Sequence, residues 1–484
     1  MRVLLTGATG YIGRRLTDKL LAAGDVELRL FVRDAAKLGE AVRARAEVAE
    51  GDTFHPDALA RALAGVDVAY YFIHSMGAGR DFASRDRLSA ENFREAAVEA
   101  GVRRLVYLGG LGVRETASEH LRSRLETGEI LSARPEAVQT VWFRAGIIIG
   151  SGSASFEIIR NLVQKAPVLI TPRWVRTRTE AVAVADVLAY LAAARDVQVE
   201  GNVVVDIGAG VTTFAELLRG AASVMGLRRL FVPLPFFTPR MGAYGLVLLT
   251  PVPFAVASAL VEGLRSETVK QNDNAARLFP RVTPRPYERA FADALDEIEA
   301  RQVLSRWCDA DAEPVCGLRP PASLEAAVYT LRRFAPTGDL PPARVFAAAS
   351  AVGGEAGWFR LDFLWKLRGV LDKLCGGPGA ARGRRDPRAL RLGDAVDFWK
   401  VREVRPGKRL LFAAELKLPG RGWLDFVVER GRFVVTAYFY PRGLLGRLYW
   451  YLYWPVHALA LADVARGVAA EAGRPDRRAG PAVA

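Results

Sequence analysis

Three glycines spaced three residues apart near the start of the chain constrain its fold more than any other feature. Gly7, Gly10 and Gly13 lie between an apolar run, residues 2–6, and an amphipathic stretch, residues 11–23. Where a strand turns directly into a helix, such glycines permit the tight turn, let a ligand approach the backbone and let the helix pack closely on the strand. The helix N-terminus adds unpaired N–H groups and a partial positive charge. We therefore expect a dinucleotide pyrophosphate to bind at Gly7, Thr9, Gly10, Tyr11, Ile12 and Gly13.

The first 150 residues alternate short apolar runs with amphipathic stretches. This alternation predicts a doubly wound α/β domain with a parallel sheet, because parallel strands need helical crossovers. The expected strands are residues 2–6, 27–32, 46–49, 66–73, 104–108 and 140–143, and the expected helices are residues 11–23, 56–64, 82–100 and 120–133. We expect the domain to extend over residues 1–300. Its substrate region, about residues 150–300, should contain helices at 182–195 and 213–225 and a strand at 202–206.

The last third of the chain has a different character. We interpret residues 301–335 as a linker, residues 336–472 as a C-terminal α+β domain and residues 473–484 as a disordered tail. Antiparallel strands are expected at 409–418, 423–429 and 433–440, with tight turns at Pro419-Gly420 and Arg430-Gly431 and a closing helix at 457–472. Six of the nine tryptophans lie here. They form either the core of this domain or the wall of a hydrophobic ligand cavity.

The residues after the second expected strand bear on which dinucleotide is bound. Arg33 lies 20 positions after Gly13, where an arginine would receive the 2′-phosphate of NADP, and Asp34 follows it, where an acid would bind the ribose of NAD. This favours NADP(H) over NAD(H). Asp52, after the third strand, is placed either to bind the adenine amino group or to hold a turn. His74, after the fourth strand, either contacts the cofactor or substrate or caps the strand.

The composition limits the compartment and the partners. The formal net charge is +14, and residues 336–484 contribute most of it, with 25 Lys and Arg against 14 Asp and Glu. This C-terminal part of the chain either presents a solvated basic surface or contacts an anionic surface such as a membrane. No recognition motif points to nucleic acid. Three cysteines without regular spacing, and no signal peptide, favour the cytoplasm and predict no metal site.

An uncharged stretch, residues 241–261, is long enough to span a bilayer. It contains Pro251 and Pro253 near its middle, which disfavours one continuous helix. We expect a buried or surface-docked apolar element, and membrane association through this stretch is the alternative.

Several segments resemble the atypical short-chain dehydrogenase/reductase superfamily, close to its NmrA-like and nucleoside-diphosphate-sugar epimerase-like members. The resembling segments are TGATGYIG (6–13), FVRDAAKL (31–38), EGD (50–52), AYYFIHSM (69–76), RLVYLGGLG (104–112) and RAGIIIGSGSASFE (144–157). The remainder resembles a bacterial domain of unknown function, through segments such as VDFWKV (396–401) and AELKLPGRGWLDF (414–426), and is similar to the START-like helix-grip fold.

The resemblance implies a Tyr-x-x-x-Lys pair on the helix after the fifth strand and a hydroxyl residue at the end of that strand. This chain departs from both. Gly109-Gly110 stands where the hydroxyl should be, with Gly109 expected at the cofactor, and the helix offers His120 and Arg124 in place of the pair. His120 is either a proton donor or a helix-start residue without chemistry, and Ser123 is a spare hydroxyl.

These observations favour an NAD(P)-dependent oxidoreductase-like protein acting on a hydrophobic small molecule. Because the usual catalytic pair is absent, a non-catalytic NADP(H)-binding redox sensor is the first alternative. A membrane-associated lipid-binding protein is the second.

Overall fold

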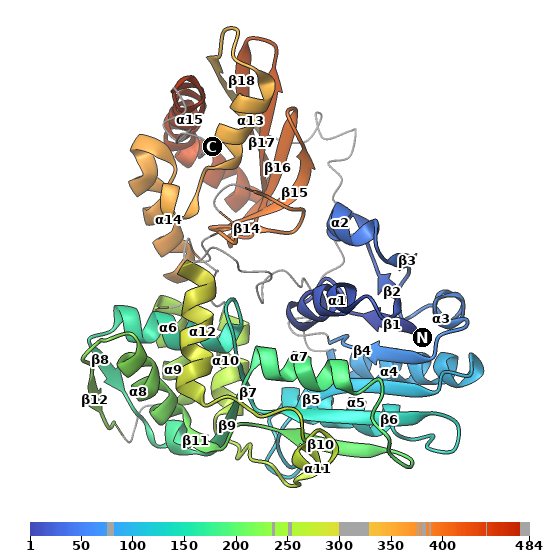
Figure 1. Ribbon diagram of the computed structural model, residues 1–484. Helices are drawn as coiled ribbons and strands as arrows, with labels where there is room; N and C mark the ends of the chain where they lie inside the picture. Colours follow the sequence, from blue (N-terminus) through green and yellow to red (C-terminus); the bar gives the residue numbers. More distant parts are fainter. Residues whose placement is uncertain are drawn as a thin grey trace, which may run out of the picture. The chain divides into compact units, whose positions relative to one another are not determined.

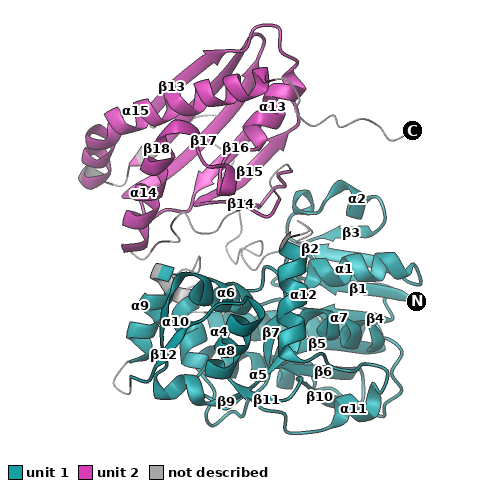
Figure 2. Ribbon diagram, turned by 60° about the vertical axis from the view of Figure 1, so that its left-hand side comes forward, with its two compact units in different colours: residues 1–314 teal, residues 315–484 magenta. Residues whose placement is uncertain are grey.

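The computed structural model describes residues 1–74, 82–234, 238–249, 254–299, 329–374, 377, 379, 384–386, 389–441 and 443–474 (Figure 1). The chain divides into two compact units, Met1–Pro314 and Val315–Ala484 (Figure 2). Each unit has its own architecture.

The first unit is built on a seven-stranded parallel sheet in the order β10-β6-β5-β4-β1-β2-β3. The strands are β1 (Arg2–Thr6), β2 (Glu27–Val32), β3 (Glu47–Glu50), β4 (Val68–Tyr71), β5 (Arg104–Gly110), β6 (Gln139–Ala145) and β10 (Val203–Ile207). The strand order reverses direction between β1 and β4, and ligands of open α/β sheets bind outside the carboxyl ends of the strands at such a point. The predicted doubly wound fold is confirmed.

Helices cover both faces of this sheet (Figure 1). On one face, α1 (Tyr11–Ala23) and α7 (Val184–Ala193) pack with Val3 and Leu5 of β1 in one apolar cluster. On the other, α3 (Pro56–Leu63), α4 (Phe82–Glu99) and α5 (Glu119–Leu131) pack with Leu4. The alternation along β1 follows from the two-residue period of a strand, whose successive side chains point to opposite faces.

The substrate region has its own apolar core, formed mainly by helices. It contains β7 (Ile147–Ile149), α6 (Ala154–Lys165), β8 (Val168–Ile170), β9 (Arg178–Ala183), β11 (Val211–Thr213), α8 (Phe214–Val224), β12 (Leu230–Val232), α9 (Pro239–Leu249), α10 (Phe254–Gly263), α11 (Asn274–Leu278) and α12 (Tyr287–Glu299). The helix expected from residue 182 is wrong at its start, because residues 178–183 pair as β9 between β7 and β11. The helix after Thr213 is confirmed, and Thr213 and Glu216 cap it reciprocally.

The uncharged stretch 241–261 forms two helices where it is described, α9 and α10. Four of its side chains, Ala243, Leu246, Ala257 and Val261, are buried in the core of the substrate region. No helix in the described part of the chain is long and apolar enough to cross a membrane.

The second unit is an antiparallel sheet in the order β13-β18-β17-β16-β15-β14. Its elements are β13 (Tyr329–Pro336), α13 (Pro342–Ser350), α14 (Asp362–Leu374), β14 (Ala395–Val396), β15 (Trp399–Arg405), β16 (Arg409–Ala414), β17 (Gly420–Glu429), β18 (Arg432–Pro441) and α15 (Gly443–Gly473). The helix α15 packs on β18 and β13. This confirms an α+β class with an antiparallel sheet, and the START-like assignment stays a prediction.

Three boundaries in this unit differ from expectation. The edge strand β13 lies inside the expected linker and pairs along its length with β18; residues 301–328 lie outside the described residues. Gly420 is not in a tight turn but begins β17, opposite Pro441. The closing helix begins at Gly443 rather than His457 and continues through Pro455, because its aromatic residues pack against the sheet.

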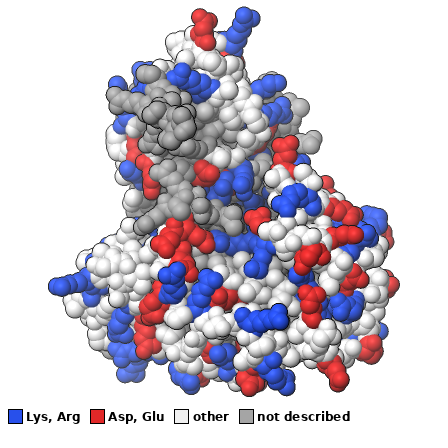
Figure 3. Space-filling view, viewed as in Figure 1, with Lys and Arg blue, Asp and Glu red and all other residues white. Residues whose placement is uncertain are grey.

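Surface charges of the first unit are mixed. Figure 3 shows Lys and Arg side chains interspersed with Asp and Glu over its visible face. Several form ion pairs, such as Arg2 with Glu27 and Arg87 with Glu126. Such a pattern is typical of a solvated surface rather than of a nucleic-acid interface.

The fragment 1–300 should fold and bind NADPH without the rest of the chain. The apolar clusters of the first unit draw only on residues within 1–300, and those of the second only on residues from Tyr329 onward. Each unit therefore buries its own core, which is what independent folding requires. We expect a cooperative thermal transition and NADPH affinity within about threefold of the whole chain. An insoluble fragment, or one that does not bind NADPH, would contradict this boundary.

Candidate functional site

The loop between β1 and α1 has the geometry that a dinucleotide pyrophosphate needs. Gly7 has a φ of +68°, and a Cβ on it would lie 2.6 Å from the carbonyl oxygen of Phe72. A Cβ on Gly13 would lie 2.1 Å from the carbonyl oxygen of Gly7. Both positions therefore exclude a side chain, and they hold the loop against the end of β4.

The N-terminus of α1 carries no capping side chain, a property that it shares with α3 and α7. Gly10 is its N-cap, and no side chain caps it. In α5, α6 and α8 the side chains of Ser118, Ser153 and Thr213 accept hydrogen bonds from the first turn. The first-turn N–H groups of α1 are therefore left for an anion, so the residues present fit a pyrophosphate.

The side chain of Tyr11 lies against the loop before α6. Its hydroxyl donates a hydrogen bond to the carbonyl of Ser151 at 3.2 Å, and Arg15 lies over its ring. Burial raises the pKa of Tyr11, so the phenol is neutral. Its side chain ties α1 to the loop before α6 and is not a proton donor at the cofactor.

Two arginines lie beside the loop at the place expected for the adenosine ribose. Arg33 follows β2 and is exposed. Arg14 donates from Nε to the carbonyl of Thr9 at 3.0 Å and from Nη2 to that of Lys37 at 3.5 Å, so it spans the glycine loop and the turn after β2. Asp34 caps that turn, since its Oδ1 accepts from Ala36 N at 2.9 Å. Sequence reasoning missed Arg14, although its position directly after the third glycine was a usable signal.

Asp52 lies in the turn after β3. Its Oδ1 accepts a hydrogen bond from the backbone N–H of Phe54 at 3.2 Å. The side chain therefore holds its own turn, one of the two roles expected for it, and contact with adenine stays a prediction.

A buried polar cluster links the end of β4 to α4 and α5. His74 Nδ1 lies 3.0 Å from Asp86 Oδ2, and Ser123 Oγ donates to the same oxygen at 3.2 Å. Asp86 is only 3% exposed. Burial and the charge of Arg124 lower the pKa of His74, although Asp86 acts in the opposite direction. His74 is therefore more than a strand cap: a carboxylate orients its ring.

His120 lies in the first turn of α5, and its ring stacks on Phe82 at 4.5 Å. Burial, then the charge of Arg124, lowers its pKa, as the spacing of one helical turn predicts. Among the described residues, His120 Nδ1 and His74 Nε2 are buried without a hydrogen-bond partner. The structure thus brings together His74, His120 and Arg124, and it adds Asp86.

Asp86 could have been found from the sequence. In α4, the residues Phe82, Ala90 and Phe93 lie at helical spacing and are all buried. Asp86 falls on the same buried stripe, where a carboxylate is rare unless it is paired. An acid within an apolar helix face was the signal.

The end of β5, where the family pattern has a hydroxyl residue, leaves little room for a side chain. A Cβ on Gly110 would lie 2.9 Å from Leu121 Cδ1, and one on Gly112 would lie 2.6 Å from Leu121 Cδ2. A Cβ on Gly109 would meet Trp142 Nε1 at 2.8 Å. Leu121 and Trp142 occupy the space of these side chains. Packing thus explains the glycine at 109, and its cofactor contact stays a prediction.

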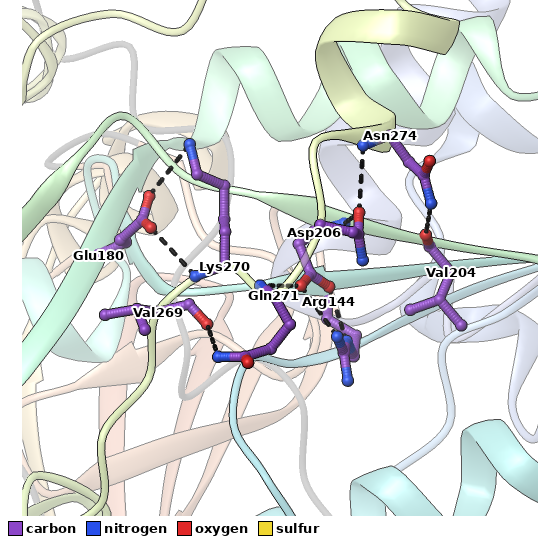
Figure 4. A network of polar contacts seen from close by, with 9 residues as sticks. Arg144, Glu180, Val204, Asp206, Val269, Lys270, Gln271 and Asn274 are labelled. Atoms are coloured by element: carbon purple, nitrogen blue, oxygen red, sulfur yellow. Dashed lines mark hydrogen bonds and ion pairs between the residues drawn. The ribbon is translucent and has the colours of Figure 1, made fainter.

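The segment after α10 is fixed by a polar network at the sheet edge (Figure 4). Arg144 and the fully buried Asp206 form paired hydrogen bonds of 2.7 and 2.9 Å, and Asp206 also accepts from Gln271 N. Glu180 accepts from Lys270 N and forms an ion pair with Lys270 Nζ.

The same segment is joined to the approach to α5. Ser266 Oγ donates to the carbonyl of Thr116, and α10 contacts α5. The negative charge of Glu262 on α10 acts to raise the pKa of His120. The helix α10 of the apolar stretch therefore borders the histidine cluster.

No group of histidine, cysteine or acidic residues that could hold a metal ion occurs in the described part of the chain. All three cysteines lie outside it.

Two family models match the chain. Residues 7–141 match a family described as NAD(P)H-binding, and residues 324–463 match a family described as a protein of unknown function (DUF2867).

Among curated proteins, the chain is similar to a ceramide reductase of Caulobacter vibrioides, with 31% identity over 242 residues, 48% of this chain and 73% of that protein. It is also similar to a (4-alkanoyl-5-oxo-2,5-dihydrofuran-3-yl)methyl phosphate reductase of Streptomyces griseus, with 28% identity over 299 residues, 60% of this chain and 95% of that protein. A triphenylmethane reductase structure from Citrobacter sp. matches with a TM-score of 0.50 and 20% identity, over 61% of this chain and 100% of that one. A nucleoside-diphosphate-sugar epimerase structure from Staphylococcus aureus matches with a TM-score of 0.50 and 16% identity, over 60% of this chain and 100% of that one. The structural matches support the fold.

Proposed function

This chain belongs to the NAD(P)-binding atypical short-chain dehydrogenase/reductase family, and from that premise we propose that it is an NADPH-dependent reductase of a carbonyl group in a hydrophobic, lipid-like molecule. The observation that carries the proposal is the pair of partly buried histidines beside the carboxyl edge of β4. There, His74 Nε2 and His120 Nδ1 lack partners among the described residues. Buried polar atoms without partners are rare, and a substrate oxygen would satisfy them.

The nicotinamide cofactor, when bound, supplies the hydride for reduction of a carbonyl carbon. The protein must then supply a proton to the carbonyl oxygen, and imidazole is the side chain that most readily does so near neutral pH. We assign this proton to His120, since it takes the position of the tyrosine in the family pattern. His74, held by Asp86, lies beside it and orients the oxygen. Burial, and after it the charge of Arg124, lowers the pKa of both rings.

The hydrophobic character of the substrate is inferred from α10, which borders this cluster, and from α9, which packs on α10. On α9, Met241 and Tyr244 are half exposed, while their neighbours Ala243 and Leu246 are buried. Ligand sites are typically lined by apolar side chains together with a few polar groups. The two curated relatives are named reductases of a ceramide and of an alkanoyl furanone phosphate, both of which bear apolar chains. A screen of long-chain ketones by NADPH oxidation tests this, and activity only on small polar ketones would contradict it.

Arg33→Ala should weaken NADPH binding by about 1.5–3 kcal/mol and leave NADH binding nearly unchanged, because a guanidinium makes charge-assisted hydrogen bonds to a phosphate. Arg14→Ala should behave similarly, since Arg14 spans the loop and the turn that follow β1 and β2. Calorimetric titration with both cofactors measures this. Asp34→Asn is the matched control, because its turn-capping oxygen is retained. Equal losses for NADPH and NADH would show that neither arginine recognises the 2′-phosphate.

The non-catalytic alternative is supported by the absence of the Tyr-x-x-x-Lys pair and by the space that Leu121 fills. A sensor would relay NADP(H) binding to the second unit. Hydrogen exchange of residues 329–474 with and without NADPH tests this. Unchanged protection together with ketone turnover would reject the sensor.

The lipid-binding alternative through residues 241–261 predicts that the chain sediments with vesicles.

A further inference from the structure

The second unit encloses a cavity that none of the functions above uses. It has a volume of about 210 Å³ and lies between α14, α15 and the strands of the antiparallel sheet. Its wall is almost wholly apolar and aromatic and includes Trp423, Phe439, Trp450 and Leu461. A cavity of about 150 Å³ suffices for a benzene-sized molecule. This one therefore has room for a longer apolar group.

Three polar atoms distinguish this cavity from a packing defect. Trp365 Nε1, Trp399 Nε1 and His457 Nδ1 are buried, and none has a hydrogen-bond partner among the described residues. All three side chains line the cavity. Each buried donor without a partner costs about 1–3 kcal/mol. A bound group that accepts hydrogen bonds would offer these side chains the partner that they lack.

A positively charged side chain lines the same cavity. Arg368 on α14 also lines the cavity. Burial, with a smaller contribution from Arg368, lowers the pKa of His457 to about 4. His457 is therefore neutral at pH 7, and Arg368 supplies the positive charge there.

The cavity is open between α14 and α15. Leu367, Leu371 and Val456 line it, yet they are 53%, 40% and 38% exposed. These side chains form an apolar rim. An apolar chain longer than the cavity can extend along this rim toward solvent.

We propose that this cavity binds a single-chain lipid carboxylate, with its chain among the aromatic side chains and its head at Trp365, Trp399, His457 and Arg368. The alkyl chain of the ligand packs against the apolar wall, and its carboxylate accepts the hydrogen bonds that the two indoles and the imidazole lack. The inference concerns the second unit alone and is independent of the reductase proposal.

The whole protein is titrated with cis-parinaric acid, whose fluorescence rises in an apolar environment, and decanoate is then added as competitor. We expect saturable binding that decanoate displaces. Ala460→Phe places a ring in the cavity and should weaken binding at least tenfold. Ala470→Phe, on an exposed position of the same helix, adds the same ring outside it and should bind as the wild type does. Absence of saturable binding to the wild type would overturn the proposal.

Because Ala460→Phe could disturb folding, Ala437→Leu on β18 is a second, smaller filling of the cavity. NADPH binding and the thermal transition, measured on the same samples, verify the fold. If both filled variants are folded and bind parinarate as tightly as the wild type, the ligand is not in this cavity.

Recognition of the carboxylate head of the ligand is tested separately. Trp399→Phe keeps an aromatic side chain and removes the indole N–H, and it should weaken decanoate binding on the order of tenfold while changing the binding of the uncharged probe diphenylhexatriene much less. Methyl decanoate should bind more weakly than decanoate, because it lacks the charge that Arg368 pairs. Equal loss for both probes, or equal binding of the ester and the acid, would overturn the carboxylate assignment.

Discussion

Gly10→Val should abolish NADPH binding, with Kd raised more than about a hundredfold. Gly10 is the N-cap of α1 and has a φ of −83° and a ψ of 175°, a conformation open to any residue. The substitution therefore leaves the backbone unstrained. Its side chain instead occupies the approach of the pyrophosphate to the first turn of α1. Calorimetry measures the loss.

Gly39→Val is the matched control for this prediction. Gly39 is also a helix N-cap with extended backbone, and a Cβ on it meets nothing within 4 Å. It should leave cofactor affinity and thermal stability nearly unchanged. If Gly10→Val binds NADPH within twofold of the wild type, the pyrophosphate does not lie on this loop.

His120→Ala should lower ketone reduction by a factor of about 10²–10⁴, the usual effect of removing a general acid. Cofactor affinity should stay nearly intact, because the glycine loop holds the cofactor. His55→Ala is the control, since His55 is an exposed histidine that caps no helix through its side chain. A His120→Ala enzyme that turns over at the wild-type rate would end the catalytic assignment of His120. A loss of turnover in His74→Ala would then identify His74 as the proton donor.

The pH profile gives an independent readout of the same site. Burial and Arg124 lower the pKa of His120 below its ordinary 6.5. A rate that depends on the protonated ring must therefore be highest at acid pH and fall as pH rises through that lowered value. Arg124→Met removes one cause of the shift, so the profile should move to higher pH. A profile that does not move would show that another group donates the proton.

The sequence by itself determined the dinucleotide-binding half of the molecule. Gly7, Gly10 and Gly13 mark a strand-to-helix turn that is recognisable from residues close together in the sequence. The strands and helices of the parallel sheet were predictable for the same reason: a two-residue or 3.6-residue period is a local property of the chain. The lowering of the pKa of His120 by Arg124 was also local, since the two residues are one helical turn apart.

Only the tertiary structure decided which residues meet across elements. Asp86 and His74 come from different elements, and Leu121 closes the space beside Gly110 from a neighbouring helix. The pairing of β13 with β18 joins residues about a hundred positions apart, and α15 continues through Pro455 because it packs on that sheet. The cavity in the second unit likewise depends on the packing of α14 and α15 on the antiparallel sheet. Such contacts depend on the packing of the whole domain, which no local period of the sequence contains.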